Sequence, residues 1–243
     1  MRVLREHVGT DRRAHLLQRF HRLRHPAWMG TMRRTVPFSD AWGYDRGTPV
    51  DRYYIDRFLM DHQSDIRGRV LEVKDSGYTE LYGSDVRERA VLDIDASNPR
   101  ATVIADLAEA DSIPSDRYDC VLLTQTLQFI FDSRGALEHA RRILAPGGVL
   151  LATVPSVSRL DRRMNDYWRF TPASCQALFG GIFGAAEVNV HVYGNVLTAT
   201  AFLMGLAQEE LSRAELDASD PRTPVLVGVR AHKPDSGSTP EEG

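Results

Sequence analysis

The sequence predicts an α/β fold with a doubly wound, mostly parallel seven-stranded sheet and an antiparallel edge strand. Short apolar runs alternate with helical segments from residue 69 onward, which is typical of parallel strands joined by crossover helices. The last two apolar runs flank a long helical segment, so we expect these two strands to pair antiparallel at the sheet edge.

The hydrophobic pattern places the individual elements. Strands are predicted at residues 69–74, 89–94, 102–105, 118–124, 148–154, 186–193 and 223–232. Helices are predicted near residues 51–61, 133–143, 171–179 and 195–213. Ser133 can cap the second of these helices, and Pro146-Gly147-Gly148 forms a tight turn before the next strand.

Composition divides the chain into three parts. Residues 1–41 are predicted to be a basic helical extension, since arginine is frequent there and acidic residues are few. Residues 42–233 form the α/β domain, and the polar residues 234–243 are expected to be disordered. A solvated helix face is the favoured interpretation of the extension, and an arm that binds anions or membrane surfaces is the alternative.

The overall balance of residues excludes several classes of function. The chain has 243 residues, of which 42% are hydrophobic and 26% charged, with a net charge of −3. The acidic balance and the lack of a basic aromatic face disfavour nucleic-acid partners. No signal peptide is visible and the longest apolar run is too short to span a bilayer, so we expect a cytoplasmic protein without a membrane partner. Cys120 and Cys175 are too few for a disulfide framework or a metal site.

The stretch Val70–Thr79 is the first indication of a ligand site. It reads as an apolar strand that ends near the acidic Glu72 and is followed by a turn. In α/β proteins an adenosine-containing ligand usually binds at the carboxyl end of the first strand. Such loops are normally rich in glycine, because the backbone must turn tightly and come close to the ligand. Here only Gly77 is present, out of the usual spacing.

The order of the motifs resembles that of the class I S-adenosylmethionine-dependent methyltransferases. The strings that carry the resemblance are VLEV, VLDID, TVIADL, YDCVLLTQTLQFI, HARRILAPGGVLLATVP and YWRFT. The chain is most similar to the bacterial group with a methyltransferase type 11 domain, which often occurs beside glycosyltransferases. The resemblance covers residues 42–233 and is most specific over residues 118–155. It implies a Rossmann-like fold, S-adenosylmethionine as cofactor and methyl transfer as the reaction.

The resemblance also implies which residues bind the cofactor. They are expected in the first loop and at the carboxyl ends of the next strands: Glu72, Lys74, Ser76, Gly77, Asp93, Asp95, Asp106, Leu107, Thr124 and Gln125. An acidic residue after the second strand would hold the ribose diol, and Asp93 and Asp95 both qualify although strand alternation points them to opposite faces. Asp106 would accept from the adenine amino group, with the Leu107 amide beside it. The alternatives are that Glu72 only caps a turn and that Asp106 is a helix N-cap.

Lys74 departs from the pattern of the family, which has glycine at this position. A lysine with positive φ is strained, and its side chain would crowd the methionine part of the cofactor. Three interpretations are open. The backbone is ordinary and Lys74 points to solvent, or its ammonium pairs with the cofactor carboxylate, Glu72 or Asp75, or the site no longer functions.

The acceptor side of the site is less defined. His191 and Asp166 are candidates for a general base, which a hydroxyl acceptor needs. Tyr167, Trp168 and Arg169 follow the fifth strand, where aromatic rings can stack on a sugar and a guanidinium can bind an anion. Trp168 has the equally good alternative of packing its loop against the domain.

Residues before the first strand are expected to cover the cofactor and contact the acceptor. Arg46 and Tyr54 are the candidates for acceptor binding, with Trp42 and Tyr53 as further members of a lid.

The predicted function is methylation of a small molecule, with O-methylation of a saccharide or glycosylated metabolite favoured by the resemblance. A catalytically silent methyltransferase-like partner protein is the alternative, because of Lys74. A nicotinamide-dependent reductase is disfavoured, since no G-x-G-x-x-G follows any strand. The sequence leaves the oligomeric state open, with a homodimer as one option.

Overall fold

The computed structural model describes residues 30–235. The chain separates into two compact units, Met1–Val36 and Pro37–Gly243. The helix predicted near the start of the basic extension and nearly all of the polar tail lie outside the described residues. The described part of the first unit holds only a 3-10 turn at Gly30–Met32, and the rest of the description concerns the second unit.

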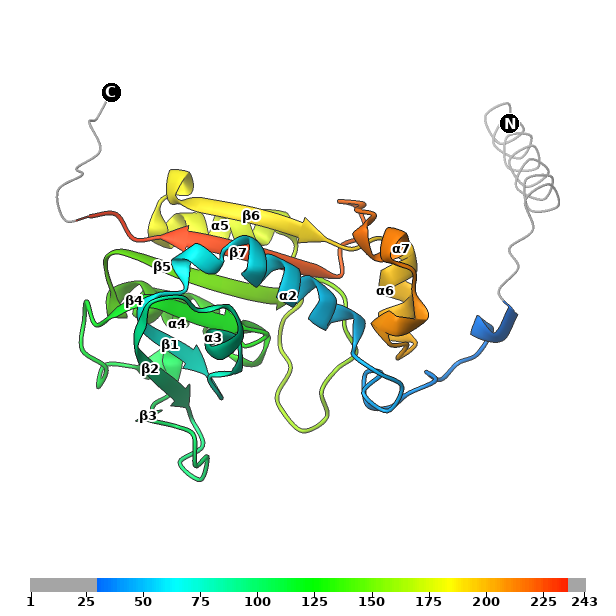
Figure 1. The fold of residues 1–243 in the computed structure, drawn as a ribbon, viewed down its shortest axis with the longest axis horizontal. Helices are drawn as coiled ribbons and strands as arrows, with labels where there is room; N and C mark the ends of the chain where they lie inside the picture. The colour runs from blue at the N-terminus through cyan, green and yellow to red at the C-terminus, as the bar shows by residue number, and fades with distance from the viewer. Residues whose placement is uncertain (1–29, 236–243) are drawn as a thin grey trace, which may run out of the picture. The chain divides into compact units, whose positions relative to one another are not determined.

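A seven-stranded sheet with the order β3-β2-β1-β4-β5-β7-β6 forms the centre of the second unit (Figure 1). Its strands are β1 Gly68–Val73, β2 Val86–Asp93, β3 Val103–Ile104, β4 Tyr118–Thr124, β5 Leu144–Pro155, β6 Val188–Tyr193 and β7 Leu226–His232. The first five strands run parallel, whereas β7 is antiparallel to both of its neighbours. The predicted fold class is confirmed, with β7 inserted one position inside the edge strand β6.

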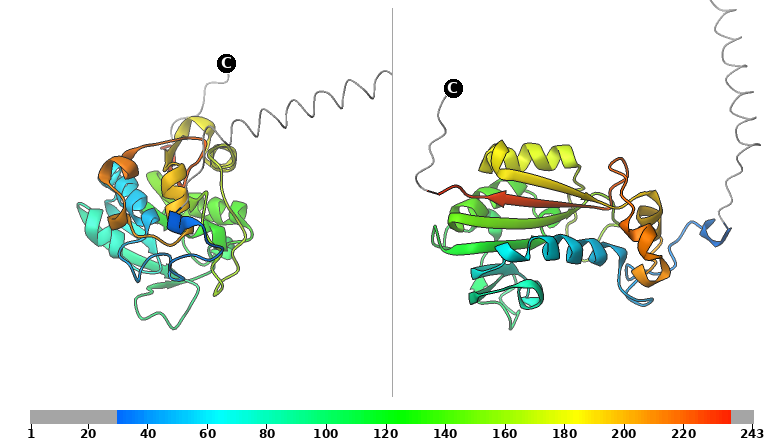
Figure 2. Two further views of the ribbon diagram at one scale, coloured as in Figure 1. Left: turned by 90° about the vertical axis from the view of Figure 1, so that its right-hand side faces the viewer. Right: turned by 45° about the horizontal axis from the view of Figure 1, so that its top comes forward.

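Helices cover both faces of this sheet (Figures 1 and 2). They are α2 Val50–Asp61, α3 Gly77–Tyr82, α4 Ser133–Ile143, α5 Pro172–Phe183, α6 Val196–Leu203 and α7 Arg213–Asp217. Residues of α4 and α5 pack with Leu71 and Leu123 in one apolar cluster. Residues of α2 and α6 pack with Val70 and Leu122 in the other. The split follows from the strand geometry, since successive side chains point to opposite faces.

Two helices differ from the sequence prediction. The segment after β1 forms the short helix α3 where a turn was expected. The long helix expected at 195–213 is divided, because α6 ends at Leu203 and Gly205 then adopts a left-handed φ of 71°. The backbone N–H of Leu206 donates to the carbonyl of Ala201 at 2.9 Å, which closes the helix end. The chain therefore turns here and starts again as α7.

Within residues 30–235 no helix is long and apolar enough to cross a membrane. Cys120 and Cys175 are free and buried. Asp119, at the start of β4, pairs with the guanidinium of Arg69 on β1 at 2.9 Å and also accepts from its backbone N–H. This carboxylate therefore joins β4 to β1.

Helix α2 sits on the sheet through a close contact between Phe58 and Gly228 of β7. A Cβ atom on Gly228 would come within 2.5 Å of the Phe58 ring, and Phe58 is fully buried. Only glycine lets the helix approach β7 this closely. The contact fixes the position of α2, whose first turn contributes to the cleft described below.

We predict that Gly228→Ala lowers the free energy of unfolding by about 1–3 kcal/mol, because the added methyl group forces the ring or the helix to move. Urea denaturation measures this change. Gly181→Ala is the matched control, since a Cβ there meets only one Arg134 nitrogen at 4.0 Å. Alanine should stabilise that helical position by about 0.5–1 kcal/mol. Equal effects of the two substitutions would contradict the packing argument.

Candidate cofactor and acceptor site

A cleft of about 1170 Å³ lies at the carboxyl ends of the parallel strands. Residues that follow β1, β2, β4 and β5 line it, together with the start of α2 and the loop at 156–170. Its volume exceeds the roughly 300–1,000 Å³ of ordinary ligand pockets, so a cofactor and an acceptor have room together. Another hollow lies at the opposite edge of the sheet, where Asp119 and Arg230 take part in ion pairs. Open α/β sheets bind ligands at the carboxyl edge, so the cleft is the candidate site.

Glu72 organises the first loop of the cleft. Its buried carboxylate accepts hydrogen bonds from the backbone N–H of Tyr78 at 3.1 Å and of Thr79 at 2.8 Å, and from the Thr79 hydroxyl at 2.7 Å. These amides belong to the first turn of α3 and have no partner within that helix. Burial raises the pKa of Glu72 although the hydrogen bonds from Thr79 and Tyr78 oppose this. Glu72 therefore caps a turn, as the alternative interpretation held, while it also lines the cleft.

Lys74 has a φ of 78°, so the interpretation with an ordinary backbone is wrong. Two hydrogen bonds hold the strained conformation: Lys74 N–H donates to the Leu92 carbonyl at 2.8 Å, and the Lys74 carbonyl accepts from Asn98 Nδ2 at 2.8 Å. No ion pair joins Lys74 to Glu72 or Asp75 among the described residues. The exposed side chain lines the cleft. The backbone at residue 74 keeps the positive φ that glycine adopts easily. Because the residue is a lysine, this conformation is strained. Whether Lys74 pairs with the cofactor carboxylate stays a prediction.

Ser76 and Gly77, both expected to bind the cofactor, lie differently with respect to the cleft. Gly77 lines the cleft and begins α3. Ser76 precedes the helix, donates its hydroxyl to Glu80 at 2.8 Å and does not line the cleft. The side chain of Ser76 is thus held by α3, and a cofactor contact from this residue stays a prediction.

The structure distinguishes Asp93 from Asp95. Strand β2 ends at Asp93, which lines the cleft and accepts hydrogen bonds from Asn98 Nδ2 at 2.7 Å and from the Asp95 N–H at 3.0 Å. Asp95 lies beyond the strand end and does not line the cleft, and its carboxylate accepts from the hydroxyl and N–H of Ser97. Asp93 is thus the better placed candidate for the ribose, because the strand ends earlier than expected, and a ribose contact from Asp95 stays a prediction.

Asp106 is the N-cap of a short 3-10 helix at Leu107–Glu109, as its alternative interpretation held. Its carboxylate accepts from the Ala108 N–H at 2.9 Å. Asp106, Leu107 and Ala108 all line the cleft. The side of the cleft next to β3 therefore contains the Asp106 carboxylate and the first residues of the 3-10 helix that it caps.

Thr124 and Gln125 line the cleft after β4, and a neighbouring glutamine completes this part of the site. Gln125 has a φ of 49°. Gln128, which the sequence analysis did not identify, is only 4% exposed and donates its Nε2 to the Gln125 carbonyl at 2.9 Å. Gln125 Nε2 and Gln128 Oε1 are buried without a hydrogen-bond partner. Both glutamines belong to the QTLQ string at residues 125–128. Only Gln125 follows β4 directly, so the sequence analysis did not identify Gln128.

Asp51 and Arg52, at the start of α2, are further cleft residues that sequence reasoning missed. Asp51 is only 8% exposed, and its Oδ1 atom has no hydrogen-bond partner. Burial raises the pKa of its carboxyl group above the usual range. Arg52 donates to the hydroxyls of Tyr44 and Tyr78, both at 3.1 Å. An acidic residue in a first helical turn usually only complements the helix dipole, which is why the sequence gave no distinct signal here.

The described residues contain five buried side-chain polar atoms without a hydrogen-bond partner, and three of them belong to residues that line this cleft: Asp51 Oδ1, Gln125 Nε2 and Gln128 Oε1. Buried polar groups in native proteins are nearly always paired. These three unpaired atoms belong to residues that line one large cleft, which fits a site whose polar ligand supplies missing partners. S-adenosylmethionine, with its ammonium, carboxylate, ribose hydroxyls and adenine, has groups of the kinds that these residues can pair with.

His191 is not part of the cleft. It lies in the edge strand β6, packs against His62 with ring centroids 4.8 Å apart, and does not line the site. Burial and the neighbouring His62 lower its pKa. The prediction that His191 is a general base is wrong, because two strands separate β6 from β4 in the sheet.

Arg46 and Tyr54 also lie outside the cleft. Arg46 forms an ion pair with Glu210. Tyr54 is buried in the core, where its hydroxyl donates to the Leu216 carbonyl at 3.1 Å. The structure places neither residue in the cleft, because Arg46 is held by its ion pair and α2 turns Tyr54 toward the sheet. Trp42 does line the cleft, as expected of a lid residue.

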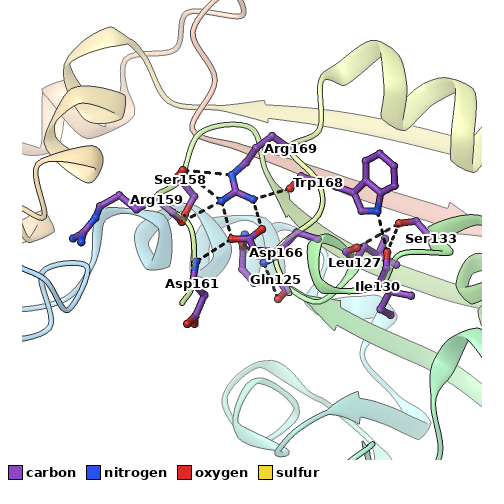
Figure 3. Close-up of polar contacts among 11 residues, drawn as sticks. Gln125, Leu127, Ile130, Ser133, Ser158, Arg159, Asp161, Asp166, Trp168 and Arg169 are labelled. Atoms are coloured by element: carbon purple, nitrogen blue, oxygen red, sulfur yellow. Dashed lines mark hydrogen bonds and ion pairs between the residues drawn. The ribbon is translucent and has the colours of Figure 1, made fainter. Parts of the chain in front are cut away.

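Asp166 and Arg169 line the cleft but are engaged with each other (Figure 3). Arg169 Nη2 donates to Asp166 Oδ2 at 2.9 Å, and the remaining guanidinium N–H groups donate to Asp166 and to the carbonyls of Ser158, Arg159 and Trp168. Burial is the largest single influence and acts to raise the pKa of Asp166, but the hydrogen bonds from Arg169 and from the Asp161 N–H, together with the charge of Arg169, outweigh it, so the pKa is lowered. A carboxylate held ionised by its partner is a weak base, and Arg169 has no donor left for an anion. Both residues organise the loop instead.

Trp168 and Tyr167 have different roles. The Trp168 indole donates to the Ile130 carbonyl at 3.0 Å and does not line the cleft, so it packs the loop down (Figure 3). Tyr167 lines the cleft, and its ring meets that of the exposed Phe131 edge-on with centroids 5.4 Å apart. Tyr167 and Phe131 thus form an aromatic wall on the acceptor side.

We predict that Lys74→Gly raises the free energy of unfolding by about 1 kcal/mol, because glycine adopts positive φ without strain. Urea denaturation measures the difference. Lys74→Ala removes the ammonium but keeps Cβ, so it should leave the stability nearly unchanged. If alanine and glycine stabilise the protein equally, the charge of Lys74 and not its backbone is the source of the cost.

We predict that Asp51→Asn stabilises the free protein at neutral pH by about 1 kcal/mol or more. The raised pKa means that the folded state holds its proton more tightly than the unfolded state. The wild type therefore loses stability as pH rises through the acidic range, whereas the asparagine variant does not. Unfolding measured from mildly acidic to neutral pH should show a gap that closes toward low pH. Asp61→Asn, at the exposed end of α2, is the control and should show no such gap.

Comparison with known proteins agrees with this geometry. The family model described as "Methyltransferase domain" matches residues 28–181. No curated protein matches the sequence. Two solved structures illustrate the shared fold. An S-adenosylmethionine-dependent methyltransferase from Archaeoglobus fulgidus has a TM-score of 0.51 at 15% identity, with 75% of this chain and 94% of that chain covered. The CurJ carbon methyltransferase has a TM-score of 0.50 at 16% identity, with 80% of this chain and 58% of that chain covered.

At these identities the two structures show a common fold. The family match covers more than half of the chain and confirms the class I methyltransferase resemblance, while the glycosyltransferase-associated subgroup stays a prediction. The chain belongs to the methyltransferase domain family.

Proposed function

We propose that the protein transfers a methyl group from S-adenosylmethionine to a hydroxyl group of a small molecule, with a saccharide or glycosylated metabolite as the acceptor class. The observation that carries this proposal is the large cleft at the carboxyl strand ends, in which unpaired buried polar atoms cluster. S-adenosylmethionine supplies a methyl group activated by its sulfonium. The protein has to align the two reactants and exclude water from them.

The residues of the cleft divide into two regions. Asp93, Asp106 and the loop after β1 lie on the cofactor side. Phe131 and Tyr167 give the other side an aromatic wall, and both rings are well exposed. An exposed aromatic face beside polar groups suits a ring that has both apolar and hydroxyl-bearing sides, as sugars do. This combination supports a saccharide-like acceptor.

A catalytically silent protein of the same fold is the second candidate. The strained Lys74 favours it, since a long side chain lines the cleft where the family has glycine. Cofactor binding and turnover separate the two candidates.

We predict that S-adenosylhomocysteine binds the wild type in isothermal titration calorimetry and that Asp93→Asn weakens binding by about 10-fold or more, since a carboxylate that holds the ribose diol is lost. Asp95→Asn is the matched control and should bind like the wild type. Turnover is then measured with radiolabelled S-adenosylmethionine and a panel of mono- and disaccharides. No binding heat at millimolar ligand would rule out the enzyme, and binding without turnover across the panel would rule out the saccharide acceptor.

A further inference from the structure

We propose that Asp51 and Arg52 form the subsite for the zwitterionic amino-acid end of the cofactor, a proposal that rests on the proposed function. The two residues are consecutive in the first turn of α2, and both line the cleft. Glu72, Lys74 and Gly77 of the first loop line the same cleft. The start of α2 and the loop after β1 thus face one space.

Arg52 connects these two elements. Its Nη1 donates to the hydroxyl of Tyr78, the second residue of α3, at 3.1 Å, and its Nε donates to the hydroxyl of Tyr44 at 3.1 Å. These two bonds fix the guanidinium beside the first loop. The structure gives its Nη2 no hydrogen bond to any residue in the described part of the chain. A rigid guanidinium with one terminal nitrogen available matches a carboxylate ligand.

Asp51 supplies the opposite charge. Its Oδ2 lies 3.9 Å from Arg52 Nε, too far for a hydrogen bond, and its Oδ1 has no partner. An amino acid carries an ammonium and a carboxylate on one carbon atom, so its binding site needs an anion and a cation a few ångströms apart. Asp51 and Arg52 present that pair without neutralising each other through a direct hydrogen bond.

The energetics agree with a ligand role. A buried carboxylate with one unpartnered oxygen is costly, and the charge of Arg52, the backbone N–H groups at the helix start and a helix dipole worth about 0.3–1 kcal/mol offset only part of that cost for Asp51. An ammonium group of a ligand would pair with Asp51 and remove the penalty. The loop after β1 holds a lysine where a glycine would let the backbone come close to the ligand. Side chains of α2 therefore replace contacts that a glycine-rich loop makes with its backbone.

Calorimetry with three nucleosides tests the proposal. The probes are S-adenosylhomocysteine, decarboxylated S-adenosylhomocysteine, which retains the amine, and methylthioadenosine, which has no amino-acid end. Asp51→Asn should weaken the first two by about 10- to 100-fold and leave methylthioadenosine unchanged. Arg52→Gln should weaken only S-adenosylhomocysteine, by a similar factor, because the other two probes have no carboxylate.

Two variants on the same helix are the matched controls. Asp61→Asn is exposed, and Arg57→Gln breaks an ion pair with Asp217 outside the cleft. Both should bind all three probes like the wild type. Thermal melts of every variant establish that it is folded. If Arg52→Gln does not fold, Arg52→Lys is used in its place.

Each outcome decides between the alternatives. If Asp51→Asn and Arg52→Gln bind S-adenosylhomocysteine with wild-type affinity, the proposed subsite is wrong although the protein binds its cofactor. If they weaken methylthioadenosine to the same extent, their effect is on the shape of the cleft and the subsite is again wrong. If the wild type binds none of the probes, the proposed function fails, and the subsite fails with it.

Discussion

The buried carboxylate of Glu72 is the interaction on which the architecture of the cleft depends. It is the next-to-last residue of β1 and accepts hydrogen bonds from two backbone N–H groups and one hydroxyl of the first turn of α3. This capping determines where α3 begins and so how the chain passes from strand to helix. The Tyr78 hydroxyl, placed by that helix, then holds Arg52 at the start of α2. One buried acid thus connects the loop after β1 to a helix that precedes it in the chain.

Much of the fold follows from the sequence, because strands and crossover helices differ in hydrophobic period. The parallel strands and α4 lie close to their predicted positions for this reason. The long C-terminal helix was predicted wrongly, since its apolar residues continue past Gly205 and periodicity does not reveal a left-handed glycine. Helix α3 was missed because its cap, Glu72, comes from the preceding strand rather than from the residue next to the helix. Caps that act across elements are invisible to local patterns.

The cofactor side of the site was more predictable than the acceptor side. Acidic residues at strand ends have a position that topology determines, and Asp93 and Asp106 line the cleft as expected. The acceptor candidates were chosen by residue type and by their place along the chain, and neither reveals the direction in which a side chain points. Trp168 and Tyr54 were read as recognition residues, yet one packs a loop and the other fills the core. Asp51 was overlooked for the opposite reason. An acidic residue in a first helical turn is usually explained by the helix dipole, so it was not considered as a ligand contact.

Several unfavourable features of the domain lie around the cleft, although Asp85 and Asp116 also have positive φ, and Arg141 and His191 also keep an unpaired buried atom, outside it. Lys74 and Gln125 are both held at positive φ, each at the end of a parallel strand that opens into the cleft. Asp51, Gln125 and Gln128 each keep an unpaired buried polar atom there. Folding alone does not explain why strained backbone and unpaired polar atoms occur around the same cleft. Binding of a ligand explains it, because the ligand can pair with these atoms. A silent protein that retained only the fold would gain stability by relaxing each of them independently. Their coincidence around a single cleft is therefore the strongest physical argument that the cleft still binds its ligand.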